Sequence, residues 1–152
     1  MPDYSLDNDD EFWQAPAKFD SLMKRAGSIG ARSSWFALGD ADTEEVPIAM
    51  VFHMEPGFII TRHTHPCERF EVVVRGSIDV GDRVLVPGDV MTSHANEMYG
   101  PKQAGPDGCT TVEVFATTSG AHHRIVEDGQ GNRTSLDIIT DFETAFKDKL
   151  KT

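Results

Sequence analysis

Two histidines, His63 and His65, are the side chains whose type and spacing point most directly to chemistry. They end the second of two apolar runs that flank a Pro56-Gly57 turn, so we expect them on a β-strand. Because side chains two residues apart on a strand point the same way, both imidazoles would face one space. Glu71 has the same parity and adds a candidate carboxylate. Two histidines and one acidic group, with open positions left over, are the ligands of a mononuclear non-haem iron site.

The glycines around these histidines carry a family resemblance. The stretch from Gly57 to Gly76 resembles the first motif of the cupin superfamily, G-x5-H-x-H-x3-4-E-x6-G. It contains Gly57, five residues, His63-Thr64-His65 and then Gly76. Both glycines and both histidines fall at the expected spacing. The resemblance implies an RmlC-like jelly roll in which His63 and His65 bind a metal ion.

The motif's glutamate position holds Arg69, with Glu68 and Glu71 on either side. Glu71 has the right parity but lies two residues beyond the motif position. Glu68 is the alternative if a bulge after Pro66 turns it inward. Arg69 could pair with Glu71, or bind a substrate carboxylate through two hydrogen bonds. A cation at this position weakens the binding of any divalent metal.

A second stretch resembles the later cupin motif, G-x5-P-x-G-x2-H-x3-N, through Gly81 and Pro87. The position of the family's third histidine is then occupied by Tyr99. Tyr99 therefore joins His63, His65 and Glu71 as a candidate metal-site residue. A phenol with a reference pKa of about 10 is a poor ligand for divalent ions unless it loses its proton, although it binds ferric iron in catalase haem. His94, five residues earlier, is the alternative if the loop is irregular.

Three further residues are candidates for substrate contacts: Arg69, His94 and His53, the last on the strand before Pro56-Gly57 and expected to line the same pocket. His122 and His123 are adjacent, so we expect them to face opposite ways and not to share one ion. The candidates for an apolar pocket wall are Trp35, Phe52, Phe70 and Met98.

From Ser33 onward the apolar pattern has a period of two in short runs separated by glycine and proline turns, which predicts an all-β protein. We expect a double-stranded β-helix, the cupin jelly roll, over residues 33–139. Residues 1–32 form an N-terminal extension with a short helix after Pro16. Residues 140–152 form a C-terminal helix opened by a Thr140–Glu143 capping box. Gly100 to Gly108 has the composition of a loop.

The composition limits the classes of partner. The chain has 152 residues, with 14 basic and 25 acidic side chains and a net charge of −11, so nucleic-acid and membrane partners are not expected. The acidic start lacks the character of a signal peptide. Two cysteines make no disulfide framework. We expect a cytoplasmic protein, and a homodimer that buries sheet edges.

Among cupins, the layout resembles small single-domain proteins related to acetylacetone-cleaving and dihydroxyacetophenone dioxygenases. That resemblance implies an iron-dependent dioxygenase acting on a small carbonyl substrate, a diketone or a phenolic ketone. Zinc or manganese in the site would instead favour a metal-dependent lyase or isomerase. An empty site would favour a non-catalytic cupin that binds a small molecule.

Overall fold

The computed structural model describes residues 3–152; Met1 and Pro2, the first residues of the predicted N-terminal extension, lie outside them. The larger of two antiparallel sheets is built from β1 (Ala31–Ala37), β2 (Ile48–Met54), β3 (Ile59–Ile60), β5 (Arg69–Asp79), β6 (Val84–Leu85), β7 (Val90–Ser93) and β8 (Lys102–Phe115). The smaller sheet contains β4 (His63–Thr64), β9 (His123–Glu127) and β10 (Arg133–Asp137).

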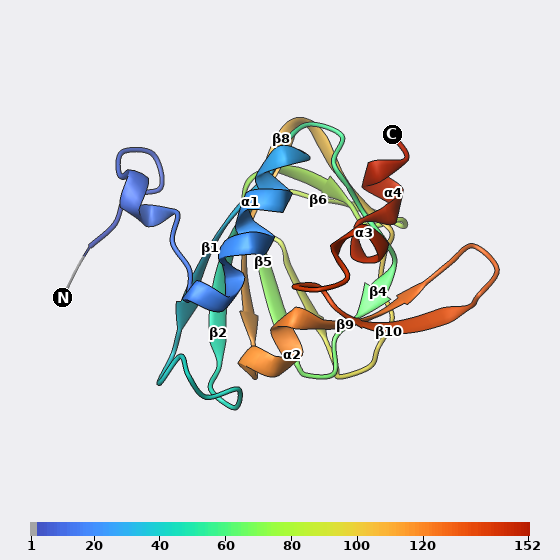
Figure 1. The fold of residues 1–152 in the computed structure, drawn as a ribbon. Coiled ribbons are helices and arrows are strands. Elements are labelled where there is room, and N and C mark those ends of the chain that lie inside the picture. The colour runs from blue at the N-terminus through green and yellow to red at the C-terminus, as the bar shows by residue number, and fades with distance from the viewer. Residues whose placement is uncertain (1–2) are drawn as a thin grey trace.

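The strand order fits a jelly roll. The larger sheet runs β1-β2-β8-β5-β6, with β3 added on β8 and β7 on β5, and the smaller sheet runs β10-β9-β4. Strands adjacent in space are therefore distant in sequence, and the two sheets enclose the interior (Figure 1). The all-β fold with short terminal helices predicted from the sequence is confirmed.

Alternation along the strands decides which side chains reach that interior. In β2, the buried positions are Ile48, Met50, Phe52 and Met54, and the intervening residues are only partly buried. This period of two is what a sheet with one covered face produces. The inward side chains of β2 form one wall of the functional cavity described below.

Helices cover one side of the barrel. The 3-10 turns η1 (Asp10–Phe12) and η2 (Ala17–Phe19) precede α1 (Asp20–Ser28), which confirms the predicted helix after Pro16. Leu22 and Ala26 of α1 are buried against the sheets. No helix among residues 3–152 is long and apolar enough to cross a membrane. The division of the chain at residues 32 and 139 stays a prediction.

The C-terminal helix differs from its prediction. Two four-residue helices, α3 (Phe142–Ala145) and α4 (Lys147–Leu150), replace the single helix. The Thr140–Glu143 capping box is wrong: Asp141 is the N-cap of α3, and the Glu143 carboxylate pairs with Arg25 of α1. A tertiary ion pair has therefore replaced the local cap. A further helix that was not predicted, α2 (Thr118–His122), is capped by Thr117, whose hydroxyl accepts a hydrogen bond from the Gly120 amide at 2.9 Å.

The stretch predicted as a loop from Gly100 to Gly108 is mostly strand, because β8 begins at Lys102 and pairs there with β3 and β5. Likewise β5 continues through Gly76, with register shifts on either side of it. Gly76 has φ +69°, and a Cβ at this position would lie 2.0 Å from the carbonyl oxygen of Gly108. The glycines that looked like breaks are thus the points where two long strands bend closely past each other.

Candidate functional site

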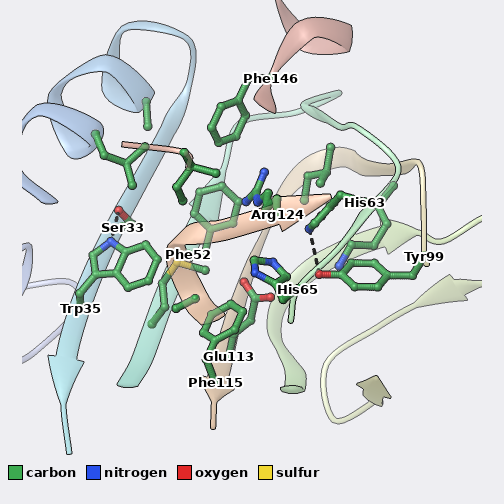
Figure 2. A pocket seen from close by; sticks show the side chains of 17 residues that line it. Ser33, Trp35, Phe52, His63, His65, Tyr99, Glu113, Phe115, Arg124 and Phe146 are labelled. Carbon is green, nitrogen blue, oxygen red and sulfur yellow. Dashed lines mark hydrogen bonds between the residues drawn. The ribbon is translucent and has the colours of Figure 1, made fainter. Parts of the chain in front are cut away.

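A narrow cavity of about 40 Å³ lies between the two sheets, with α1 and the C-terminal segment on one side. Figure 2 shows aromatic side chains along its walls and a polar end that includes His63, His65, Tyr99, Glu113 and Arg124. The buried cation Lys102 also lines the cavity. The walls are formed by Leu22, Ala26, Trp35, Met50, Phe52, Ile60, Phe115, Ala121, Ile138 and Phe146. Of the predicted wall residues, Trp35 and Phe52 line the cavity, whereas Phe70 is exposed and Met98 is not among the lining residues.

His63 and His65 lie together at the polar end, with ring centroids 5.1 Å apart, and both are buried. Nδ1 of His63 donates to the Thr61 carbonyl oxygen at 2.7 Å, and Nδ1 of His65 donates to the Gly120 carbonyl oxygen at 2.8 Å. Because a carbonyl oxygen only accepts, these bonds place the proton on Nδ1 and leave Nε2 as an acceptor. Burial, assisted by the positive charge of Arg124, holds the pKa of both imidazoles well below the usual range. Both rings are therefore neutral.

Tyr99 is brought to His63 by the backbone. The two residues form an isolated antiparallel bridge, with both amide-to-carbonyl bonds made. The Tyr99 hydroxyl lies 2.8 Å from Nε2 of His63 and donates to it. Burial raises the pKa of Tyr99, so the phenol keeps its proton. The free acceptor of His63 is thereby occupied.

The predicted carboxylate ligand, Glu71, lies in a buried ion network beside the cavity and does not line it. Its oxygens accept from Arg69 at 2.5 Å and from Lys102 at 2.9 Å. Burial acts to raise the pKa of Glu71, but Lys102 and Arg69 outweigh it and lower the pKa overall. Glu71 is therefore an ionised partner of two cations, and it has no hydrogen bond to either histidine.

Glu113 is the acidic residue that does line the cavity. It lies opposite Glu71 in the β5–β8 register, and Arg69 donates to it at 2.5 Å. Burial and the charge of Glu71 raise the pKa of Glu113. Arg69, predicted to contact substrate, is instead held between these two carboxylates and is not among the lining residues.

Arg124 reaches the cavity from β9. The residue as a whole is only partly buried, but its Nε and Nη1 atoms are inaccessible and have no hydrogen-bond partner among the described residues. Its guanidinium carbon lies 5.1 Å from the Phe146 ring centroid. Two buried guanidinium donors thus border the cavity unpaired, a costly arrangement for a protein interior.

The remaining predicted site residues lie elsewhere. His94 is at the surface, with 86% of its side chain exposed, and its Nδ1 lies 2.8 Å from a Glu68 oxygen. Glu68 therefore does not turn inward, and His94 does not replace Tyr99. His53 lies on the outer face of β2, where Nδ1 is 2.8 Å from the Thr110 hydroxyl, in a cleft separate from the cavity. His53 and Phe52 are neighbours on β2, so their side chains lie on opposite faces of the strand. Phe52 is the one that lines the cavity.

Sequence reasoning missed Glu113 and Arg124, although both carry a signal. Glu113 has the same strand parity as the buried Phe115, and Arg124 has the same parity as the buried Val126. A charged residue in line with inward apolar positions is a candidate for a buried functional group.

No protein-family model and no curated protein sequence matches the chain. Solved structures do resemble it. An RmlC-like cupin protein from Ralstonia eutropha JMP134 matches 81% of this chain and 76% of its own, with TM-score 0.54 and 14% identity. A "putative acetylacetone dioxygenase" from Methylibium petroleiphilum PM1 matches 96% of this chain and 94% of its own, with TM-score 0.55 and 15% identity. The chain therefore has the RmlC-like cupin fold.

The residues of the cavity do not fit the divalent metal ion that this fold family implies. Among residues 3–152, no three His, Cys, Asp or Glu side chains at the cavity bring ligand atoms within 4.8 Å of one another. Nε2 of His63 is engaged by Tyr99, and the motif's glutamate position holds the cation Arg69. Arg124 adds a second guanidinium whose charge already acts on both histidines. The ligand set therefore lacks the carboxylate and the third imidazole that would offset a 2+ charge.

Proposed function

We propose that the cavity binds a small organic carboxylate, recognised by Arg124 without a metal ion. The observation that carries the proposal is the pair of buried, unpartnered donors, Nε and Nη1 of Arg124, at the polar end of the cavity. A carboxylate is the partner that the planar guanidinium group binds most strongly, through charge-assisted hydrogen bonds. The ligand would satisfy donors that the protein itself leaves free.

The balance of charge supports an anion. The cations of this cluster are the buried Arg69 and Lys102 and the partly buried Arg124, whereas the only buried carboxylates among the described residues are Glu71 and Glu113. Three cations against at most two anions leave at least one positive charge uncompensated. The neutral histidines and the protonated Tyr99 do not change that balance. Because an isolated buried charge is strongly unfavourable, a ligand with one negative charge would stabilise the site.

The walls and the volume define the rest of the ligand. Trp35, Phe52, Phe115 and Phe146 offer only apolar surface to a bound molecule. About 40 Å³ corresponds to roughly three water-sized spheres, so a ligand of a few heavy atoms fits without rearrangement. Nε2 of His65 has no partner among the described residues' hydrogen bonds and would accept from a donor on the ligand. These features favour a short-chain monocarboxylate over a phosphate ester.

The binding experiment compares acetate with acetamide by calorimetry. We expect acetate to bind with a dissociation constant between about 40 µM and 10 mM, as a ligand of four heavy atoms permits, and acetamide to bind at least about tenfold more weakly. Arg124→Met should abolish the preference for acetate. Arg133→Gln, which removes an exposed arginine of the same hairpin, should leave it unchanged. Equal binding of acetate and acetamide, or acetate binding retained by Arg124→Met, would overturn the proposal.

Elemental analysis of protein purified without chelator tests the prediction of an iron-dependent dioxygenase. Near-stoichiometric iron that both His63→Ala and His65→Ala lose would favour that enzyme over the binding protein proposed above. Zinc or manganese lost by the same two variants would favour a lyase or isomerase. Our proposal expects no metal that depends on His63 or His65.

A further inference from the structure

A second cluster of potential ligands lies outside the cavity, where α2 passes into β9. His122, His123 and Asp137 bring ligand atoms within 4.8 Å of one another, the only such group among residues 3–152. The expectation that the adjacent histidines face opposite ways is wrong, since their ring centroids lie 4.3 Å apart. The alternation rule applies within a strand, and here α2 ends at His122 while β9 begins at His123.

The hydrogen bonds of the two rings leave one nitrogen of each directed at Asp137. Nδ1 of His123 donates to the Ser119 carbonyl oxygen at 2.7 Å, which leaves Nε2 3.7 Å from Asp137 Oδ2. Nε2 of His122 lies 2.8 Å from the Glu44 carboxylate, which leaves Nδ1 3.1 Å from Asp137 Oδ1. A histidine that donates its other N–H to a carbonyl or carboxylate is the usual arrangement around a bound metal ion.

The spacing of these atoms suits a tetrahedral ion. Two ligand atoms that are each about 2.0–2.2 Å from zinc in a tetrahedral site lie about 3.4 Å from each other. The two nitrogen-to-carboxylate distances, 3.1 and 3.7 Å, lie on either side of that value. Asp137 is also held in place, because its Oδ1 accepts from the Ile139 amide at 2.9 Å. Each imidazole thus approaches a different oxygen of a carboxylate whose position is fixed by the backbone.

The site is open to solvent on one side. The His123 side chain is 43% exposed and that of Asp137 is 29% exposed, whereas His122 is buried. A surface cleft lined by Pro66, Ile125, Ser135 and Asp141 lies in front of His123 and Asp137. Water can reach a fourth coordination position there, and Asp141 is the other carboxylate that lines the cleft.

We propose that His122 Nδ1, His123 Nε2 and the Asp137 carboxylate form a zinc site, with water in the fourth position. Two imidazoles and one carboxylate are ligands that Zn²⁺ accepts, and three protein ligands with one open position are common for it. Glu44 and Ser119 orient the two rings from behind. The ion would tie the end of α2 to β9 and β10, and none of its three protein ligands lines the cavity.

The test is calorimetric titration of EDTA-treated, dialysed protein with zinc chloride. We expect one Zn²⁺ per chain, and at least a tenfold loss of affinity in His123→Gln and in Asp137→Asn. His94→Gln, which removes an exposed histidine far from the cluster, and His63→Gln, which removes a cavity imidazole bonded only to Thr61 and Tyr99, should bind zinc as the parent does. Thermal unfolding should show zinc raising Tm in the parent and in both controls, and not in His123→Gln.

Three outcomes would contradict the proposed zinc site. The first is the absence of stoichiometric zinc binding. The second is binding that His123→Gln and Asp137→Asn leave intact. The third is binding lost through His63→Gln, which would move the ion to the cavity. Circular dichroism of each variant without zinc shows whether it is folded, and His123→Gln is chosen because its side chain is largely accessible.

Discussion

The hydroxyl of Tyr99 lies 2.8 Å from Nε2 of His63, the ring nitrogen through which this residue would bind a metal ion. The contact is fixed by the backbone bridge between the two residues and by the Nδ1 bond of His63 to Thr61. The phenol and the imidazole thus satisfy each other. This pair is the clearest reason why the cavity is described better as a polar binding site than as a metal centre.

Removing the Tyr99 hydroxyl should destabilise the protein. Tyr99→Phe leaves Nε2 of His63 as a buried acceptor with no donor, which costs about 1–3 kcal/mol. Urea unfolding measures the change. Tyr4→Phe is the matched control, because Tyr4 is 40% exposed and its change should stay within about 0.5 kcal/mol. A Tyr99→Phe protein as stable as the parent would contradict the buried hydrogen bond.

Replacing Arg124 by methionine and replacing Arg69 by methionine should change the free energy of unfolding in opposite directions. Arg124→Met removes two buried donors, Nε and Nη1, that have no hydrogen-bond partner among the described residues, and should stabilise the ligand-free protein by about 1–3 kcal/mol. Arg69→Met leaves Glu71 and Glu113 without their shared partner and should destabilise it by about 3–5 kcal/mol. Urea unfolding of both variants without ligand makes the comparison. Destabilisation by Arg124→Met would show that its guanidinium has an internal partner.

Acid should destabilise the fold in the range where free histidine titrates. Burial lowers the pKa of His63 and His65 well below 6.5, so the unfolded chain binds more protons and the free energy of unfolding rises with pH. This contribution is fully present above about pH 6.5 and is lost as the pH falls. Glu113, with a raised pKa, acts in the opposite sense, while His53, with a pKa lowered mainly by burial, adds to the effect.

Between about pH 4.5 and 5.5 the unfolded chain binds protons on both histidines, whereas the folded chain binds one on Glu113, so the net slope should be about 1.4 kcal/mol per pH unit. Urea unfolding at several pH values in this range measures the slope, and His65→Gln should reduce it. A free energy of unfolding that stays constant or rises toward acid pH would contradict neutral, buried imidazoles.

Two glycines with similar backbone angles allow a test of the bend between β5 and β8. Gly57 and Gly76 have φ of +76° and +69°, but only at Gly76 would a Cβ meet another backbone atom, the Gly108 oxygen at 2.0 Å. Gly57→Ala should cost about 1–2 kcal/mol for the left-handed backbone alone. Gly76→Ala should cost at least about 3 kcal/mol, because the strands must separate as well. Equal losses of stability in the two variants, measured by thermal unfolding, would contradict the close approach of β5 and β8 at Gly76.

Local patterns were enough to predict the strands, the turn at Pro56-Gly57 and the shared face of His63 and His65, because these depend on a period of two and on turn chemistry. They did not reveal the pairing of β8 with β5, which places Glu113 opposite Glu71 and turns a predicted loop into strand. Nor did they reveal that α2 ends at His122, which brings His122 and His123 together. Both features depend on contacts between segments distant in sequence, which residue type and spacing do not encode.

The most direct test of the account is the Nε–H signal of Arg124 in an NMR titration with acetate. The signal is assigned by its loss in Arg124→Met. We expect it to move on addition of acetate, saturating with the calorimetric dissociation constant, and to stay unchanged on addition of acetamide, while the Nε–H of Arg133 moves with neither. An Arg124 signal that acetate leaves unmoved, at concentrations where calorimetry detects binding, would contradict the assignment of Arg124 as the carboxylate receptor.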